Sequence, residues 1–220
     1  MDAAGPQLKM IANYAVGFDN IDLKAAKARG IIVTNTPGPE ISEAVAEHVI
    51  AMIFALAHRI AATVAFSRKG KSHGWGPEML LGTDVYGSTI GIIGGGAIGT
   101  AVARRMRDGF DVKILYHDIK RNPELEVTTG AKFCTLAQLL KKSDVVSLHV
   151  PLLPSTRHMI GAKELAMMKP SAFLVNTSRG PIVDEAALVD ALRRNIIAGA
   201  GVDVYDHEPS IPRALRKLRN

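Results

Sequence analysis

Short apolar runs alternate with segments of helical periodicity over most of the 220 residues. In the second half of the chain, five apolar runs predict strands: Thr89–Ile93, Val112–Tyr116, Val145–Val150, Ala172–Asn176 and Ala200–Val204. Helical periodicity between these runs predicts four helices near Ile98–Arg107, Leu136–Lys141, Ala162–Met168 and Asp184–Arg194. Strands this apolar, alternating with helices, are typical of a parallel sheet covered on both faces. We therefore expect a doubly wound α/β fold.

The first third of the chain has shorter elements and one long helix. Three short elements are predicted: a strand at Leu8–Ala12, a helix at Asp22–Arg29 closed by Gly30, and a strand at Ile31–Thr34. A long helix is expected from Ser42, the predicted N-cap, to about Phe66. Apolar residues cover nearly its whole circumference, so we expect it to be buried on more than one side, between domains or subunits.

Residues 67–88 are rich in glycine and polar residues, which indicates an exposed linker between two units. We therefore expect two domains. The first comprises residues 1–81 and includes the long helix and the linker. The second comprises residues 82–220 and carries the alternating strands and helices.

Composition excludes several classes of protein. Hydrophobic residues make up 47% and charged residues 22%, a balance typical of a globular chain rather than a disordered one. The apolar run Val49–Ala57 is far shorter than the ~20 residues of a membrane span, and no secretory signal is visible. The single cysteine, Cys134, excludes an internal disulfide and favours a reducing compartment. We expect a soluble, cytoplasmic protein without a membrane partner.

The net charge of +6 raises the question of nucleic-acid binding. Nucleic-acid binders concentrate their basic residues on one face or helix, whereas here they are spread along the chain except in the last eight positions. Aromatic residues, which stack on bases, make up only 5%. The charge therefore favours a solvated surface that attracts small anions, without a nucleic-acid partner.

A glycine-rich turn carries the first candidate chemistry. Residues Gly94 to Gly99 form the pattern G-x-G-x-x-G directly after a predicted strand and at the start of a helix. Asp118 ends the next strand, 19 residues after Gly99. This arrangement predicts a dinucleotide site in which the helix N-terminus binds the pyrophosphate and Asp118 binds the ribose hydroxyls. The alternative is a tight turn without a ligand.

Asp118 also bears on which dinucleotide would bind. Its carboxylate would repel a 2′-phosphate, so it favours NAD over NADP. Lys120 and Arg121 follow closely and soften that preference, which leaves NADP as the alternative cofactor.

Further motifs follow the later strands: His149–Leu152, Asn176–Glu185 and Gly201–Pro209. Arg179 and Glu208 each come just after a predicted strand, at the edge where open α/β sheets bind ligands. Taken singly, such an arginine is more often part of a surface ion pair, and such a glutamate is more often a solvated loop residue. Their joint presence with a dinucleotide turn favours a substrate site.

With these motifs, and with Asn13–Asp22 and Asn35–Gly38, the sequence resembles the D-2-hydroxyacid dehydrogenase family over essentially its whole length. The nearest branch is that of the glyoxylate and hydroxypyruvate reductases. The resemblance implies reduction of a small 2-keto acid to the D-2-hydroxy acid with NADH or NADPH and without a metal. It implies a Rossmann domain that lacks its last strand, a partial flavodoxin-like substrate domain, and a homodimer formed through the long helix. The alternatives are a non-catalytic dinucleotide-binding protein and a corepressor-like scaffold of the same fold.

The resemblance also implies roles for individual residues. Arg179 would bind the carboxylate and keto oxygen of the substrate, and Glu208 would orient the catalytic histidine. The backbone amides of Val16 and Gly17 would hold the substrate carboxylate. The implied cofactor-binding residues are Gly94, Gly96, Ala97, Ile98, Gly99, Asp118, Ile119, Lys120, Val150, Pro151, Thr177, Ser178, Arg179 and Asp203.

The sequence departs from the family pattern in three places. Gly95 stands where a large aliphatic residue is usual, and Ala97 stands where an arginine usually contacts the pyrophosphate, so we expect weakened cofactor binding. The family histidine that donates the proton, in a Pro-His-[Ile/Leu]-Gly segment, would fall beyond Asn220, and neither His158 nor His207 matches it. The N-terminal strand also comes early relative to the family. We therefore expect a truncated product or a fragment, with impaired activity.

Overall fold

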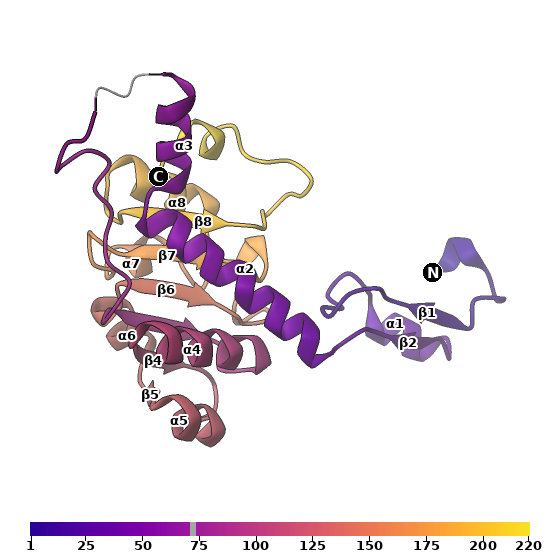
Figure 1. Cartoon of the computed structure of the whole chain (residues 1–220). Helices are drawn as coiled ribbons and strands as arrows, with labels where there is room; N and C mark the ends of the chain where they lie inside the picture. Colours follow the sequence, from indigo (N-terminus) through magenta and orange to yellow (C-terminus); the bar gives the residue numbers. More distant parts are fainter. Residues whose placement is uncertain (71–73) are drawn as a thin grey trace. The chain divides into compact units, whose positions relative to one another are not determined.

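The computed structural model describes residues 1–70 and 74–220, and it divides into two compact units (Figure 1). The first unit is Met1–Ile41 and the second is Ser42–Asn220. This division lies well before the expected domain boundary at residues 81 and 82. The difference arises because the long helix buries Ala46, Val49 and Ile53 in the core of the second unit. Residues 71–73 of the predicted linker lie outside the described residues.

The first unit contains two short parallel strands and one helix. Strand β1 (Met10–Ala12) pairs with β2 (Ile32–Thr34), and α1 (Leu23–Ala28) connects them after the 3-10 turn η1 (Asp2–Ala4). The carboxylate of Asp22 caps α1 by accepting the Ala25 N–H at 2.9 Å. Gly30, with φ +65°, ends the helical segment. The three elements predicted from the sequence are therefore confirmed.

The second unit is built on a six-stranded parallel sheet with the strand order β5-β4-β3-β6-β7-β8. Its strands are β3 (Thr89–Ile93), β4 (Lys113–His117), β5 (Lys132–Phe133), β6 (Val145–Leu148), β7 (Phe173–Asn176) and β8 (Gly199–Val202). The chain starts in the middle of the sheet, builds outward to β5 and then returns to add β6 beside β3. This reversal of strand order, as in a Rossmann fold, creates a crevice where β3 and β6 end.

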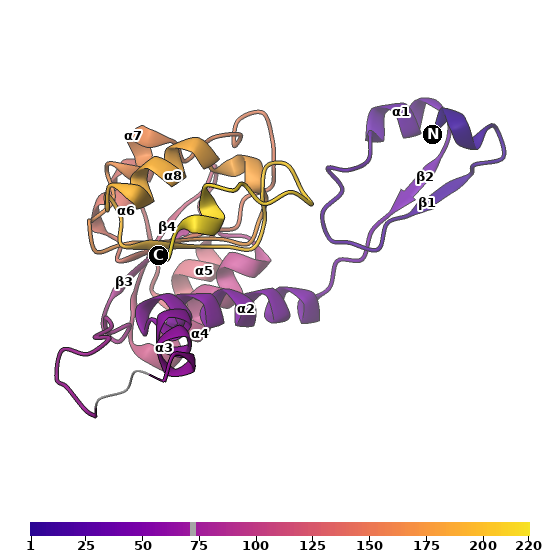
Figure 2. The same ribbon diagram turned by 90° about the horizontal axis from the view of Figure 1, so that it is seen from above.

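Helices cover both faces of this sheet, as the sequence predicts (Figure 2). The helices are α2 (Pro39–Ala57), α3 (Ile60–Arg68), α4 (Ala97–Phe110), α5 (Pro123–Thr129), α6 (Leu136–Lys142), α7 (Ala162–Leu165) and α8 (Glu185–Arg193). Val145 and Val175 point into a core shared with α2 and α4. Their strand neighbours Val146 and Leu174 point into a second core shared with α6, α7 and α8. Two 3-10 turns, η2 (Gly180–Ile182) and η3 (Leu215–Lys217), complete the unit.

The long helix differs from its prediction in three respects. It begins at Pro39 rather than after Ser42, because proline suits the first turn of a helix. It is also broken: Arg59 adopts a left-handed conformation (φ 52°), and α2 and α3 meet at a bend of 60°. Finally, the sequence predicts a helix that lies between domains or subunits, whereas α2 packs within the second unit, where Val49, Ile53 and Ala57 are buried against the sheet and α4. Only α3 has no buried residue among those described.

The predicted linker is a connection within the second unit rather than a link between the two units. Much of it is exposed, as expected, with Trp75 and Tyr86 strongly so. Val85, however, is buried in the core beneath α2, and the Thr83 N–H donates to the Ala57 carbonyl at 2.8 Å. The segment therefore continues the packing of α2 onto the first strand of the sheet.

Helix α5 and strand β5 have no counterpart in the sequence analysis. The signals for α5 are nevertheless present: Asn122 caps the helix, Pro123 occupies its first turn, and Gly130 ends it with φ +67°. Strand β5 is only two residues long, and both are exposed, so its pattern carries no hydrophobic signal.

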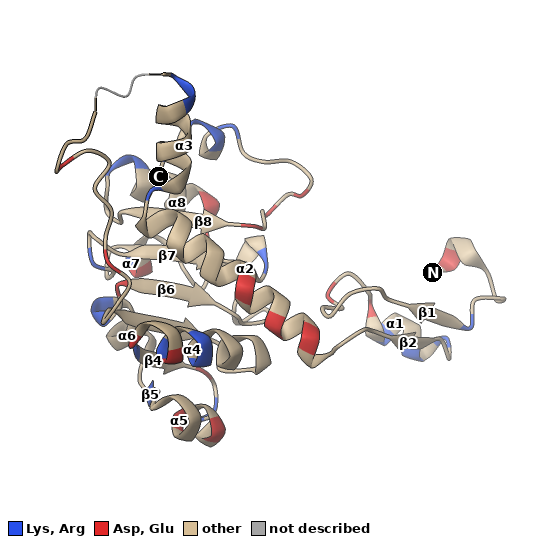
Figure 3. Cartoon of the chain, in the orientation of Figure 1, with Lys and Arg blue, Asp and Glu red and all other residues tan. Residues whose placement is uncertain are grey.

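No single described helix is long and apolar enough to cross a bilayer; α2 and α3 reach that length only together, as a bent pair. Basic residues are distributed over many elements of the second unit (Figure 3). Acidic residues on α2 meet basic residues on α4, where Glu43 binds Arg104 at 2.6 Å and Arg105 at 2.7 Å. The hydrogen bond from Arg105 lowers the pKa of Glu43.

Candidate functional site

The glycine turn lies between the ends of β4 and β6. Gly94 has φ +100°, which favours glycine, and its N–H donates to the His117 carbonyl at 2.9 Å. A Cβ atom at Gly94 would lie 2.7 Å from the backbone carbonyl carbon of His149. The turn is therefore packed directly against the backbone that leaves β6, at the point where the strand order reverses.

Two glycines of this turn have opposite surroundings. A Cβ atom at Gly99 would lie 2.1 Å from the carbonyl oxygen of Gly94, so the first turn of α4 needs glycine there to pack on the strand. A Cβ atom at Gly96, the N-cap of α4, would meet nothing within 4 Å, and Gly96 and Ala97 are exposed. Ile98 is half-buried. The open space thus lies at a helix N-terminus, where unpaired N–H groups and the helix dipole bind phosphate.

Asp118 lies beside the turn, as its spacing from Gly99 predicts. Its carboxylate accepts the Gly95 N–H at 2.7 Å and the Ile119 N–H at 2.6 Å. Each carboxylate oxygen keeps a lone pair that could accept a ribose hydroxyl. The side chains of Ile119 and Lys120 are exposed next to it. The arrangement suits an adenosine ribose at the end of β4.

A hydrogen-bond network that was not predicted from the sequence holds the carbonyl of Gly95. The Asn122 side-chain amide donates to the Gly95 carbonyl at 2.7 Å, and the Asn122 N–H donates to the Tyr116 hydroxyl at 2.8 Å. The Tyr116 hydroxyl in turn donates to Glu126, whose two oxygens accept from Arg121 at 2.9 and 2.6 Å. The hydrogen bond from Arg121 lowers the pKa of Glu126, and burial raises the pKa of Tyr116.

The same side chains explain the departure at Gly95. A Cβ atom there would lie 3.2 Å from both the Tyr116 ring and the Leu125 side chain, so these two residues already fill the space of a larger side chain. The sequence signal for this was the helix start at Asn122-Pro123, which places Leu125 and Glu126 in the first turn of α5.

The segment after β6 contributes a histidine and two of the predicted cofactor residues. His149 is part-buried, and its Nε2 lies 2.9 Å from the Ser147 hydroxyl. Burial lowers the pKa of His149 to about 4, which keeps the imidazole neutral at neutral pH. Val150 is half-buried and Pro151 is exposed at the same edge of the sheet. His149 belongs to the motif His149–Leu152, but its residue type and position alone predict no role for it.

The loop after β7 holds Arg179 through its backbone. The Ser178 hydroxyl donates to the Leu148 carbonyl at 2.6 Å, which ties this loop to the end of β6. The side chain of Asn176 accepts the Ser178 N–H at 3.0 Å and donates to the Arg179 carbonyl at 2.9 Å. Arg179 Nη1 donates to the Ser178 carbonyl at 2.7 Å, and Thr177 is half-buried beside it.

A close backbone contact brings this loop to the one after β8. A Cβ atom at Gly180 would lie 2.0 Å from the backbone carbonyl carbon of Tyr205. Glu208, which is exposed, accepts the Tyr205 N–H at 2.9 Å. The structure therefore joins the segments that carry Arg179 and Glu208, although the two lie 29 positions apart in the sequence.

Asp203 has a partner that the sequence did not suggest. Its N–H donates to the Asn176 carbonyl at 3.0 Å, which fixes the end of β8. Its carboxylate lies 3.5 Å from Nε2 of His48 on α2, and both side chains are about half exposed. No periodicity in the sequence pairs His48 with Asp203, because the contact depends on how α2 crosses the sheet.

The Val16–Gly17 loop lies in the first unit and is described by itself. The Asn35 side chain donates to the Val16 carbonyl at 2.9 Å, and the Asn13 side chain donates to the Gly17 carbonyl at 2.8 Å. With the carbonyls held in this way, the loop presents N–H groups that bind no partner within the described residues. Such a loop suits a carboxylate ligand.

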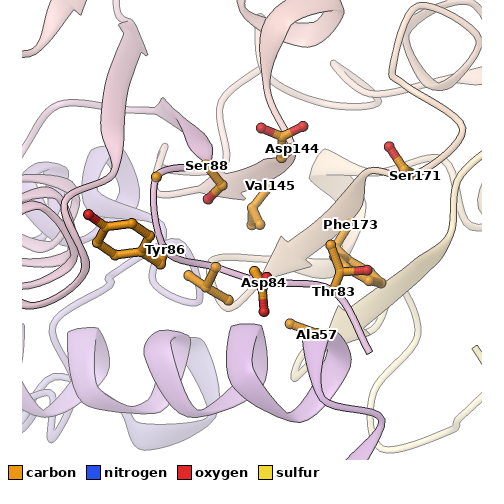
Figure 4. A pocket seen from close by; sticks show the side chains of 11 residues that line it. Ala57, Thr83, Asp84, Tyr86, Ser88, Asp144, Val145, Ser171 and Phe173 are labelled. Atoms are coloured by element: carbon orange, nitrogen blue, oxygen red, sulfur yellow. The ribbon is translucent and has the colours of Figure 1, made fainter. Parts of the chain in front are cut away.

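A hollow lies at the opposite edge of the sheet, at the amino ends of β3, β6 and β7 (Figure 4). Asp84, Asp144, Ser88 and Phe173 are among its lining residues, and it contains none of the predicted site residues. Its two carboxylates make it unsuited to the phosphates of a dinucleotide. In residues 1–70 and 74–220, no group of three or more His, Cys, Asp or Glu side chains could hold a metal ion.

Comparison with known proteins agrees with this arrangement. Residues 50–220 match the model of the NAD-binding domain of D-isomer specific 2-hydroxyacid dehydrogenases. The chain is 51% identical to a glyoxylate reductase of Thermococcus litoralis, over 98% of this chain and 66% of that protein. The TT0316 protein of Thermus thermophilus is similar in structure, with a TM-score of 0.88 and 44% identity, over 96% of this chain and 66% of that one.

A D-lactate dehydrogenase with NAD+ from Lactobacillus jensenii is also similar in structure. It has a TM-score of 0.79 and 37% identity, over 94% of this chain and 64% of that one. The chain thus spans about two thirds of the length of these relatives.

Proposed function

Since the chain belongs to the D-isomer specific 2-hydroxyacid dehydrogenase family, we propose that it reduces a small 2-keto acid to the D-2-hydroxy acid with NADH. The 51% identity to a glyoxylate reductase supports a substrate of the size of glyoxylate or hydroxypyruvate. NADPH is the alternative cofactor. The proposal concerns the activity of the whole protein, of which this chain matches about two thirds.

The observation that carries the proposal is the open space at Gly96. The turn is tight wherever protein packs on it, at Gly94 and Gly99, and empty only at the N-terminus of α4. A pyrophosphate fits that space because the helix N-terminus offers N–H donors there, and Asp118 lies where the ribose would follow.

We assign the two ends of the cofactor to different strands. Gly94, Gly96, Ala97, Ile98 and Gly99 would bind the pyrophosphate, while Asp118, Ile119 and Lys120 would border the adenosine ribose. The residues expected at the nicotinamide end are Val150, Pro151, Thr177, Ser178, Arg179 and Asp203. When bound, the nicotinamide supplies the hydride.

Arg179 is the residue we propose for the substrate. Its planar guanidinium can donate to the carboxylate and to the keto oxygen together, and in doing so it polarises the carbonyl that accepts the hydride. The N–H groups of Val16 and Gly17 would bind the same carboxylate. Both assignments follow the family resemblance.

Glu208 is proposed as a positioning residue. By the resemblance it accepts a hydrogen bond from the family histidine that donates a proton to the keto oxygen, which raises the pKa of that histidine. The loop geometry supports this role, because Gly180 holds the Arg179 and Glu208 segments together.

We make three further proposals, on domain type, oligomeric state and cellular location. The first unit, Met1–Ile41, would be part of a flavodoxin-like substrate domain. The exposed apolar side chains of Ile60 and Val64 on α3 support a homodimer formed through that helix. The single cysteine supports a reducing, cytoplasmic location.

The test combines cofactor binding with turnover. NADH titrated into the chain should bind, as followed by its fluorescence. In the chain extended to the full length of its relatives, in which turnover is measured for each variant, glyoxylate should then accelerate NADH oxidation. Arg179→Ala should lower kcat/KM for glyoxylate by roughly a hundredfold or more, because it removes a charge-assisted contact to the reacting group. Arg194→Ala is the matched control: this exposed arginine directly follows the last residue of α8, and its loss should change neither quantity.

The outcomes separate the alternatives. A chain that binds no NADH would contradict the proposal. A chain that binds NADH but turns over no 2-keto acid, even when extended to the full length of its relatives, would favour the non-catalytic dinucleotide-binding protein or the corepressor-like scaffold.

A further inference from the structure

An ion pair lies three residues beyond the acid that faces the adenosine ribose. Arg121 donates through Nε and Nη2 to the two carboxylate oxygens of Glu126, at 2.9 and 2.6 Å. This bidentate geometry is the strongest that an arginine makes with a carboxylate. The Arg121 side chain is 66% exposed and that of Glu126 only 22%, so the arginine is held by a carboxylate that is itself fixed against the protein.

Glu126 is fixed from its other side by a buried tyrosine. Tyr116 is fully buried; its hydroxyl donates to Glu126 and accepts the Asn122 N–H at 2.8 Å. The side chain of Asn122 then donates to the carbonyl of Gly95 in the glycine turn. The Arg121–Glu126 pair is therefore built onto the same turn that Asp118 contacts through the Gly95 N–H.

The position of this pair bears on the choice between NADH and NADPH. The two cofactors differ by one phosphate on the 2′-oxygen of the adenosine ribose, and the segment that follows Asp118 borders that ribose. An arginine free to move there would attract the extra phosphate. An arginine held bidentately by a carboxylate has its charge compensated, and the donors on its Nε and Nη2 side are already in use.

We propose that Glu126 is a specificity-determining residue: it withholds Arg121 from the 2′-phosphate and so adds to the preference for NADH that Asp118 establishes. This inference rests on the proposed function, since it concerns the cofactor of that same site. It also bears on the expectation that Lys120 and Arg121 soften the preference for NADH, because a withheld Arg121 would not contribute to that softening.

The experiment compares the affinities for NADH and NADPH in four variants of the full chain. Glu126→Gln removes the charge but keeps an oxygen that Tyr116 can bond. It should shift the NADPH-to-NADH affinity ratio toward NADPH by roughly tenfold, since Arg121 becomes able to form a charge-assisted contact with the phosphate. Glu124→Gln removes the same charge from the same turn of α5, where its side chain is exposed, and should leave the ratio unchanged.

Two further variants test whether a shift in the affinity ratio comes from the release of Arg121 or only from the loss of a negative charge. Arg121→Ala combined with Glu126→Gln should return the ratio to that of the wild-type chain. Arg121→Ala alone should leave NADPH affinity unchanged, because Arg121 is already withheld; this arm does not depend on how well Glu126→Gln folds. A fall in NADPH affinity in Arg121→Ala would show that the arginine already binds the phosphate and would overturn the inference.

The remaining outcomes are also decisive. The inference is wrong if Glu126→Gln and Glu124→Gln have the same ratio, or if the gain in Glu126→Gln survives the loss of Arg121. Either result in a chain that binds NADH leaves the proposed function intact. A wild-type chain that bound neither cofactor would contradict the proposed function, and the inference with it.

Discussion

The glycine turn after β3 and the loop after β8 lie at the same edge of one sheet, yet they are held in different ways. The turn is enclosed. The Gly95 N–H donates to Asp118 and the Gly95 carbonyl accepts from Asn122. Gly94 packs against the backbone of His149, and Gly99 packs against that of Gly94. In the β8 loop, by contrast, the Asp203 side chain is about half exposed and Glu208 is exposed. Tyr205 of this loop makes a close backbone contact with Gly180.

The difference separates two tasks of the site. The enclosed turn presents a preformed surface with one open position, which suits a ligand bound the same way each time. The exposed loop instead carries charged groups, Asp203 and Glu208, whose side chains are open to solvent. The following experiments test this contrast, starting with the largest expected effect.

Gly180→Ala should have the largest effect on stability, because it disrupts the close backbone contact between Gly180 and the β8 loop. The new methyl group would overlap the backbone of Tyr205 and Asp206, which cannot move aside as a side chain could. We expect the free energy of unfolding to fall by about 3 kcal/mol, as measured by urea unfolding. Gly109→Ala on α4, where a Cβ atom meets nothing, should instead stabilise by about 0.5–1 kcal/mol.

Gly99→Ala applies the same change to the enclosed turn. Its methyl group would overlap the Gly94 carbonyl and approach Ile92, which should displace α4 from β3. We expect a loss of about 2 kcal/mol in the free energy of unfolding, together with a loss of NADH binding. If NADH affinity survived unchanged, the turn would not be the cofactor site.

His149 tests how strongly the turn side of the crevice is shielded from water. Its pKa is about 4 in the folded chain and about 6.5 when exposed, so between these values the unfolded state binds more protons. The free energy of unfolding should therefore fall as pH drops from about 7 to about 4.5, by about 2 kcal/mol from this residue. His149→Asn should remove that part of the pH dependence, while an unaltered profile would show that the imidazole is solvated.

Ala97→Arg should have the smallest of these effects. It restores a cation at the exposed first residue of α4 and should tighten NADH binding by about tenfold or less. Ala186→Arg adds the same charge to the first turn of α8 and should not change binding. Equal affinities in the two variants would mean that the departure at Ala97 is harmless.

The sequence predicted the parts of the molecule that local patterns determine. The spacing of Asp118 from Gly99 places it correctly beside the turn, because a helix and a strand of fixed rise separate them. The break at Arg59 was not predictable in this way, since neither glycine nor proline marks it. Val85 was missed for a similar reason: one apolar residue among polar ones gives no periodicity, although packing under α2 buries it.

The contacts that shape the site required the structure. His48 meets Asp203 because α2 packs across the sheet, and the sequence does not specify that packing. Arg121 meets Glu126 because their side chains adopt conformations that the sequence does not specify either. The expectation of weakened cofactor binding at Gly95 rested on the backbone freedom that glycine adds where a large aliphatic residue is usual. The structure instead places Tyr116 and Leu125 in its space, so only the departure at Ala97 still predicts a lost contact.

The central claim is that the glycine turn is shaped for a ligand rather than for packing alone, and Gly96 tests it most directly. Gly96→Ala places a methyl group where no atom beyond its chain neighbours lies within 4 Å, so the free energy of unfolding should fall by no more than about 1 kcal/mol, the cost of alanine at a helix N-cap. NADH affinity should nevertheless fall by roughly tenfold or more, because the methyl group occupies the approach of the pyrophosphate. An unchanged NADH affinity in a stably folded Gly96→Ala chain would contradict the account.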